Sequence, residues 1–360
     1  MSHSRRTKKD DIQYKNGKTE YLTVKNKKSE VTPIVTSEVK NGMIKQVPQH
    51  KSLGTWFEES EGYTVNIEKN LQKLPFMILT TKVQASPSNL GTLAVQGRLK
   101  LLEAVVIPSL LYNTEAFQSI PEKDIQQLEK MQLKMLTEVL EVTRSTPYYP
   151  LLMETGFWTM RARISYRRLM LYHNIVVSDE RRITKQLIEE QKRQMRNTTW
   201  YSEIQREIEK YKITLEPQNS LKSEWKKHVK DKITAETTSE LKTKCSEMTK
   251  GRWITSKELV LSEYLKKLSL KESKKILRVR MNMVKIPGNY KGNSVEFCPL
   301  CKLEERNAEH YFHCSQVKQI KESCGVVESD LKSSNIKVMQ NVALFFENVE
   351  IMVEPVMKKI

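Results

Sequence analysis

The chain has 360 residues, with 61 Lys and Arg against 43 Asp and Glu and a formal net charge of +18 at pH 7. This excess favours a polyanionic partner, most often nucleic acid. No apolar run approaches the roughly 20 residues that span a bilayer, and the charged first residues lack the apolar core of a secretion signal. We therefore expect an intracellular protein, in the nucleus or cytoplasm, that is neither secreted nor embedded in a membrane.

The positive charge is distributed unevenly along the chain. Residues 1–28 carry nine Lys and Arg against three acids, and residues 264–291 carry nine against one. Residues 315–360 are balanced, with six basic and six acidic side chains. The basic run 264–291 is therefore the predicted nucleic-acid surface, with contacts expected from Lys266, Lys267, Lys271, Lys274, Lys275, Arg278, Arg280 and Lys285.

The first fifty or so residues are rich in β-branched side chains and short turn signals. Asn41-Gly42 lies between two such stretches, and this dipeptide is typical of a tight hairpin turn. We expect strands on both sides of it, so the N-terminal part of the chain is predicted to be a small β-rich region.

From about residue 66 to 286 the pattern changes to apolar residues spaced three and four apart, which indicates amphipathic helices. Pro121 is placed to open one of them, with Glu122 and Asp124 at the positive end of its dipole. The predicted fold class is mainly α. The apolar face of that helix is expected to contain Ile125, Leu128, Met131, Met135 and Val139.

The sharpest local motif is CPLCKLEERNAEHYFHC, residues 298–314. Cys298 and Cys301 are separated by two residues, so one tight turn can direct both thiolates at one ion, and one helical turn can present His310 and Cys314 together. This pattern predicts a closed, structural Cys3His zinc site. His313 is the other candidate for the fourth ligand, but adjacent side chains diverge, which favours His310 over it.

Two alternatives to zinc are a redox-active cysteine pair and a chance cluster. A redox pair is expected at a strand-to-helix junction with an activated first thiol, and it makes no use of the His and Cys that follow. Zinc is therefore the favoured interpretation. Cys245 and Cys324 have no partner at ligand spacing and are expected to be ordinary, partly buried thiols.

Several stretches, taken in order, resemble the C-terminal part of the reverse transcriptases of non-LTR (LINE-type) retrotransposons. Residues 16–26, NGKTEYLTVKN, and 51–59, KSLGTWFEE, resemble the end of the polymerase palm. Lys18 matches a late-palm lysine that protonates the leaving group, and Leu53-Gly54 match the hairpin that grips the primer. Residues 97–117 resemble the helical thumb, and the cysteine motif resembles the C-terminal zinc knuckle of this family.

The resemblance implies a mainly α architecture with a small β-rich palm remnant, a long helical thumb and connector, and a small zinc knuckle. The implied regions are a palm remnant at 1–62, a thumb-like domain at 63–200, a basic connector at 201–290, a Cys3His knuckle at 291–318 and a neutral tail at 319–360.

The activity of the family does not transfer with the resemblance. Its polymerases hold two metal ions on palm aspartates, whereas Asp10-Asp11 have charged neighbours and precede Lys18 by too few residues. We expect no enzyme activity from these residues alone. The implied function is to bind RNA or an RNA–DNA duplex, and the implied partner is an upstream polymerase half supplied in trans. The alternative is a non-enzymatic helical zinc protein that serves as a protein-interaction module, derived from a domesticated or decaying copy of such an element.

Overall fold

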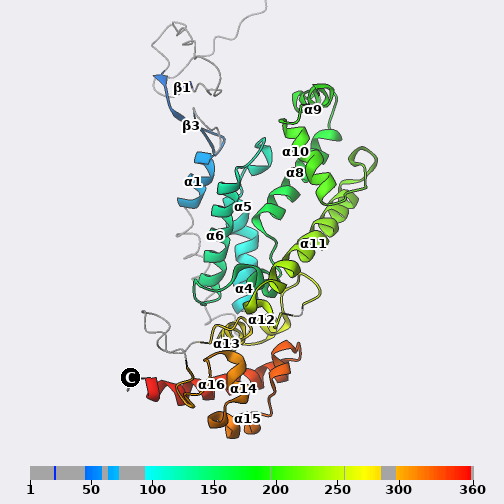
Figure 1. Ribbon diagram of the computed structural model, residues 1–360. Coiled ribbons are helices and arrows are strands. Elements are labelled where there is room, and N and C mark those ends of the chain that lie inside the picture. The colour runs from blue at the N-terminus through cyan, green and yellow to red at the C-terminus, as the bar shows by residue number, and fades with distance from the viewer. Residues whose placement is uncertain are drawn as a thin grey trace, which may run out of the picture. The chain divides into compact units, whose positions relative to one another are not determined.

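The computed structural model describes residues 20–21, 45–58, 64–72, 94–194, 196–254, 256–284 and 297–357. The chain divides into two compact units, Met1–Gln72 and Lys73–Ile360, and its described part is mainly helical, as predicted (Figure 1). Within these ranges we find no helix that combines the length and the apolar character needed to cross a membrane.

The first unit contains two small sheets and one helix. Strands β1 (Glu20–Tyr21) and β2 (Lys45–Gln46) pair in parallel, whereas β3 (Gln49–Ser52) and β4 (Thr55–Glu58) form an antiparallel hairpin. Helix α1 (Thr64–Gln72) packs on β4, where the Asn66 side chain accepts a hydrogen bond from the Trp56 backbone N–H at 3.2 Å. The predicted Asn41-Gly42 turn lies outside the described residues.

Leu53 and Gly54 form the two-residue turn of the hairpin between β3 and β4. Both have positive φ, 46° and 86°, and the hairpin register places Ser52 opposite Thr55. Positive φ is costly for a residue with a branched side chain, and the Leu53 side chain is 92% exposed. An apolar side chain is thus held at the tip of a tight hairpin, without burial to compensate for its conformation.

The second unit is mainly a succession of helices. Its first half contains α4 (Ala94–Leu101), the π-helix η2 (Leu102–Val106), α5 (Ile107–Leu110), η3 (Thr114–Ala116), α6 (Glu122–Val139), α7 (Tyr148–Thr155), α8 (Met160–Val176), α9 (Ile183–Gln194) and α10 (Trp200–Lys210). Its second half contains η4 (Pro217–Asn219), α11 (Lys222–Ser246), η5 (Thr249–Gly251), α12 (Glu263–Lys267), α13 (Leu270–Arg280), α14 (Ala308–His313), η6 (Ser315–Val317), α15 (Lys318–Cys324), η7 (Glu328–Lys332) and α16 (Ile336–Met357).

Helix α6 confirms the periodicity argument. It begins at Glu122, directly after Pro121, and four of the five predicted core side chains are buried, with Met131 partly exposed. A separate cluster joins α8, α10 and α11 around Trp225, whose indole N–H donates to the Leu169 carbonyl at 3.1 Å. These contacts stack α11 on α8 and place the two helices side by side.

The C-terminal residues form a second core rather than a detached tail. Aromatic side chains of α14 and α16 meet there, with the rings of Phe312 and Phe345 5.2 Å apart and those of Tyr311 and Phe346 6.5 Å apart. Trp253 and Val279 join the same cluster from earlier in the chain. Residues of the segment 319–357, which was expected to be a neutral tail, therefore share a core with Tyr311 and Phe312.

Gly156 terminates α7 with φ of +71°, and a Cβ built there would lie 2.6 Å from the backbone nitrogen of Leu261. We expect Gly156→Ala to cost about 2–5 kcal/mol of unfolding free energy, because it adds a backbone clash to left-handed strain. Gly325 is the matched control, since it has φ of +61° but no atom within 4 Å of its Cβ position. Gly325→Ala should cost about 1–2 kcal/mol from strain alone. Urea unfolding of both variants measures the difference in unfolding free energy. Equal losses of stability in the two variants would contradict the close contact between position 156 and the Leu261 backbone.

Candidate functional site

Cys298 and Cys301 lie on a tight turn that follows an isolated β-bridge between Phe297 and Glu305. The Cys298 N–H donates to the Glu304 carbonyl at 2.8 Å, and the Lys302 N–H donates to the Cys298 carbonyl at 2.8 Å. Lys302 has a positive φ of 58°, so the chain reverses sharply after Cys301. This turn directs both thiols to one side, as the two-residue spacing predicts.

His310 and Cys314 are presented by α14 and its C-terminal end. The Asn307 side chain caps the helix by accepting from the His310 N–H at 2.8 Å, and the Cys314 N–H donates to the His310 carbonyl at 2.7 Å. The Asn282 side chain accepts from the Ala308 N–H at 2.9 Å and so attaches the start of the helix to the segment after α13. Short-range capping therefore fixes the second pair of side chains.

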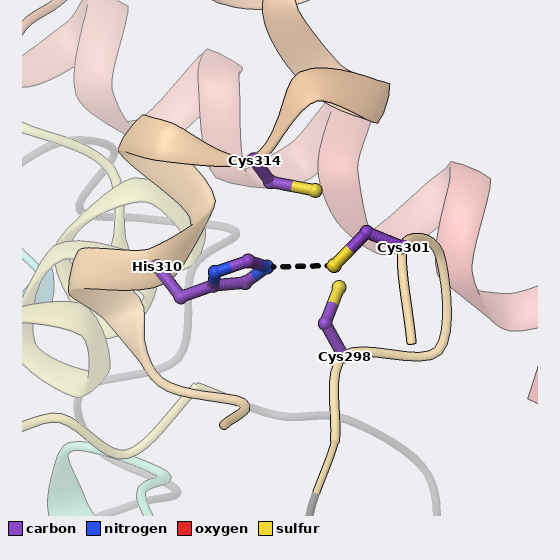
Figure 2. A group of neighbouring side chains, drawn as sticks. All are labelled: Cys298, Cys301, His310 and Cys314. Carbon is purple, nitrogen blue, oxygen red and sulfur yellow. Dashed lines mark hydrogen bonds between the residues drawn. The ribbon is translucent and has the colours of Figure 1, made fainter. Parts of the chain in front are cut away.

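The four side chains converge, as Figure 2 shows. Their ligand atoms lie within 4.8 Å of one another, and Cys301 Sγ is 3.3 Å from His310 Nε2. A tetrahedral zinc with Zn–S near 2.3 Å and Zn–N near 2.0 Å would place its ligands about 3.5–3.8 Å apart. Three sulfurs and one imidazole nitrogen in this arrangement can hold a metal ion with only a small contraction of the cluster.

A carboxylate orients the histidine of the cluster. Glu304 Oε2 lies 2.9 Å from His310 Nδ1, which leaves Nε2 facing the sulfurs. Metal-bound histidines commonly use their second ring nitrogen in this way. His313, by contrast, lies outside the cluster with its side chain 63% exposed and 3.2 Å from Glu328. Sequence reasoning missed Glu304, although a carboxylate within the motif itself was the available signal.

The three thiols differ in their pKa values in the metal-free cluster. Burial raises the pKa of Cys314 to about 12, and burial also raises that of Cys298. Burial acts in the same direction on Cys301, but hydrogen bonds from the Leu303 and Glu304 backbone N–H groups outweigh it and lower its pKa to about 7. Cys301 is thus the thiol that most readily supplies a thiolate at neutral pH.

The cluster is closed by protein on most sides. Cys298 is fully buried, and Cys314 and His310 are each 5% exposed. Cys298 and Cys314 belong to the same core as Tyr311 and Phe312, so the ligand side chains and the C-terminal core are continuous. Four protein ligands also leave no coordination position for water or substrate, which is the arrangement of structural rather than catalytic sites.

The residues predicted to contact nucleic acid lie mainly on α12 and α13, and most are engaged within the fold. The Arg278 side chain donates to the Glu141 carbonyl at 3.4 Å, and Lys285 lies outside the described residues. The ion pairs of this set are Lys266 and Lys267 with Glu263, Lys271 with Glu347, Lys274 with Glu141, and Lys275 with Glu347 and Glu350. Exposed ion pairs contribute at most about 1 kcal/mol, so a phosphate can still compete for the exposed Lys267 and Lys271.

Arg280, another member of the predicted set, is buried. Its Nη2 lies 3.2 Å from Glu154 Oε1 and donates to the Trp253 carbonyl at 3.0 Å. Glu154 is fully buried, and its other oxygen accepts from the Ser262 hydroxyl at 2.7 Å. Arg280 therefore joins α13 to α7, and its side chain is not presented to a surface ligand.

Comparison of this chain with protein families, with curated proteins and with solved structures found no match.

Proposed function

We propose that this chain is a nucleic-acid-binding module held together by a structural zinc ion, and that it acts as the C-terminal portion of a LINE-type reverse transcriptase without a polymerase centre of its own. It holds RNA or an RNA–DNA duplex. The observation that carries the proposal is the Cys3His cluster, because it lies in the chain order expected for the knuckle of that family.

Zinc is the metal that best suits the donor set. Three thiolates and one imidazole are soft-to-borderline ligands that favour Zn²⁺ over the oxygen-seeking Mg²⁺ and Ca²⁺. Cys298, Cys301, His310 and Cys314 would hold the ion, and Glu304 would fix the tautomer of His310. When bound, the ion supplies a cross-link between the cysteine turn and α14.

Nucleic-acid binding is supported by the net charge of +18 and by exposed basic side chains. Lys267 and Lys271 have the most exposed side chains among the ion-paired lysines of the predicted set, at 61% and 75%. The hairpin tip adds an exposed apolar side chain at Leu53, at the position that resembles the primer grip. Within the second unit the exposed lysines are suited to contact the phosphate backbone, and within the first unit the exposed apolar side chain is suited to contact bases.

The proposal predicts RNA binding that falls steeply with salt. If six to ten phosphates are contacted, affinity should fall by about 10³–10⁵ between roughly 50 and 200 mM salt. Lys267→Ala/Lys271→Ala should lower the slope of log K against log salt by about 1.5–2, since each lysine releases counterions from one phosphate. Fluorescence anisotropy with RNA and with an RNA–DNA duplex measures both quantities.

The matched control is Lys130→Ala/Lys222→Ala, which removes the same charge from exposed lysines on α6 and α11. Its slope should stay closer to that of the wild type. If the wild-type protein binds neither RNA, DNA nor the hybrid at low salt, the proposed function is wrong. Template-dependent extension of a primer by the isolated chain would contradict the proposed absence of a polymerase centre.

A second candidate function, protein interaction, is favoured by the outer face of α16. Leu344 and Ile351 lie seven residues apart on this helix and are 50% and 62% exposed. Apolar side chains at this spacing share one helical face. A chain with this function would bind zinc but would show no salt-dependent affinity for nucleic acid.

A further inference from the structure

The second unit also contains a groove whose lining includes none of the four residues of the Cys3His cluster. It has a volume of about 1140 Å³ and is lined by residues of α4, α8 and α11 and by the segment 257–261. We call it the basic groove. Helix η2, one turn of π-helix, forms part of its wall beside α4.

The lining of the basic groove is strongly positive. Among the described residues that line it, eight are basic and three are acidic. Arg163 lies 3.1 Å from Glu103, and Arg167 makes two hydrogen bonds to Glu115, at 2.8 and 2.9 Å. Five lysines of the lining are exposed and have no ion pair with any described residue. They are Lys100, Lys226, Lys230, Lys242 and Lys257.

Three of these lysines form a row on α11. Lys226 and Lys230 are four residues apart, and Lys242 follows twelve residues after Lys230. All three belong to one i, i+4 series, which runs obliquely round the helix, and Lys226 and Lys242 are separated by about 24 Å along the axis. Lys100 on α4 and Lys257 on the segment 257–261 add positive charge from other walls. A row of this length suits an extended polyanion rather than a single small anion.

The basic groove also contains aromatic side chains. Trp158 and Tyr166 both line it, are partly exposed, and meet edge to face with ring centroids 5.5 Å apart. Gln132 holds the Trp158 backbone by donating to its carbonyl at 2.8 Å. Aromatic rings beside a lysine row are the combination that binds single-stranded nucleic acid, because unpaired bases stack on the rings while phosphates meet the lysines.

We propose that the basic groove binds a single-stranded polynucleotide, with the backbone along the α11 lysine row and at least one unpaired base on Tyr166. This assignment rests on the proposed nucleic-acid-binding function and places it mainly on residues outside the basic run 264–291, although Lys266 of that run also lines the groove. A paired duplex does not suit this arrangement, since its bases stack on one another and are not free to contact the ring.

The test measures the affinity of the full chain for a labelled oligouridylate of about 16 nucleotides, the upper site size of a single-strand-binding domain. Lys226→Glu/Lys230→Glu/Lys242→Glu is expected to weaken binding by at least about tenfold near 100 mM salt and to lower the salt slope by about 2. Tyr166→Leu should weaken binding by at least about fivefold, and Tyr166→Phe should restore it.

Lys130→Glu/Lys222→Glu/Lys337→Glu is the control of equal charge change, because all three lysines are exposed and none lines the groove. This control variant should lower affinity far less than the triple substitution in the groove does. Thermal unfolding should show that both triple variants are folded. Equal losses in the two triples, with wild-type binding intact, would overturn the groove assignment but not the proposed function. Equal affinity for the annealed duplex, with no effect of Tyr166→Leu, would overturn the single-strand assignment. No binding by the wild type would overturn both.

Discussion

Cys298→Ser and Cys314→Ser are each expected to release the proposed zinc ion and unfold the C-terminal core. Both side chains belong to the metal cluster and to the packed core that contains Tyr311 and Phe312. Structural zinc supplies about 10–16 kcal/mol of apparent binding free energy in small zinc domains, and that energy is coupled to folding. Loss of one thiolate should therefore remove most of the stability of this core. Metal analysis and hydrogen exchange along α16 measure the two effects together.

Cys324→Ser is the matched control for the zinc experiment. Cys324 is 7% exposed and lies in the same core, but it is not among the clustered ligands. This variant should keep one zinc per chain and retain protection along α16. Chelation of the wild type should reproduce the cysteine variants. Purified wild type without zinc, or α16 that stays protected after zinc is removed, would contradict a structural zinc ion, and a Cys298–Cys301 disulfide would favour the redox alternative.

Glu154→Ala is expected to destabilise the second unit by about 3–5 kcal/mol. Removing the carboxylate leaves the Arg280 guanidinium buried without its counter-charge, and this is the main cost of breaking a buried ion pair. It also removes the acceptor of the Ser262 hydroxyl. The unfolding free energy from urea denaturation provides the measurement.

Lys244→Ala is the control for the buried pair. Lys244 and Glu247 lie 3.6 Å apart with both side chains more than half exposed, so the loss should stay below about 0.5 kcal/mol. Replacing both buried partners, as Glu154→Leu/Arg280→Met, should recover part of the stability because no charge remains unpaired. A cost for Glu154→Ala no greater than that for Lys244→Ala would show that the Glu154–Arg280 pair does not stabilise the fold.

The metal cluster could be predicted from sequence because its determinants are local. All four ligands lie within residues 298–314, where turn geometry and one helical turn fix their positions. Exclusion of His313 also followed from local geometry, since neighbouring side chains on α14 point in different directions. Helix α6 was predictable for the same reason, because apolar residues spaced three and four apart indicate a helix with one buried face.

Which basic side chains are ion-paired or buried could not be predicted from local spacing. Glu347 is distant in sequence from Lys271, yet their side chains meet at 2.6 Å, and the Lys271 hydrogen bond lowers the pKa of that carboxyl. Arg280 belongs to the same basic run as Lys271, but its side chain is buried in the core. Charge density along the chain is a local count, whereas the partner of each charge is set by helix packing.

The sequence by itself determined that the protein is mainly helical and strongly basic, and that it carries four clustered Cys and His side chains that can hold one metal ion. These properties depend on residue types and on spacings of a few residues. Only the tertiary structure decided that residues of 319–357 join the core that contains Cys298 and Cys314, and that the lysines of α11 line the same groove as Trp158 and Tyr166. Those contacts join residues far apart in the chain, so they arise only when the helices pack.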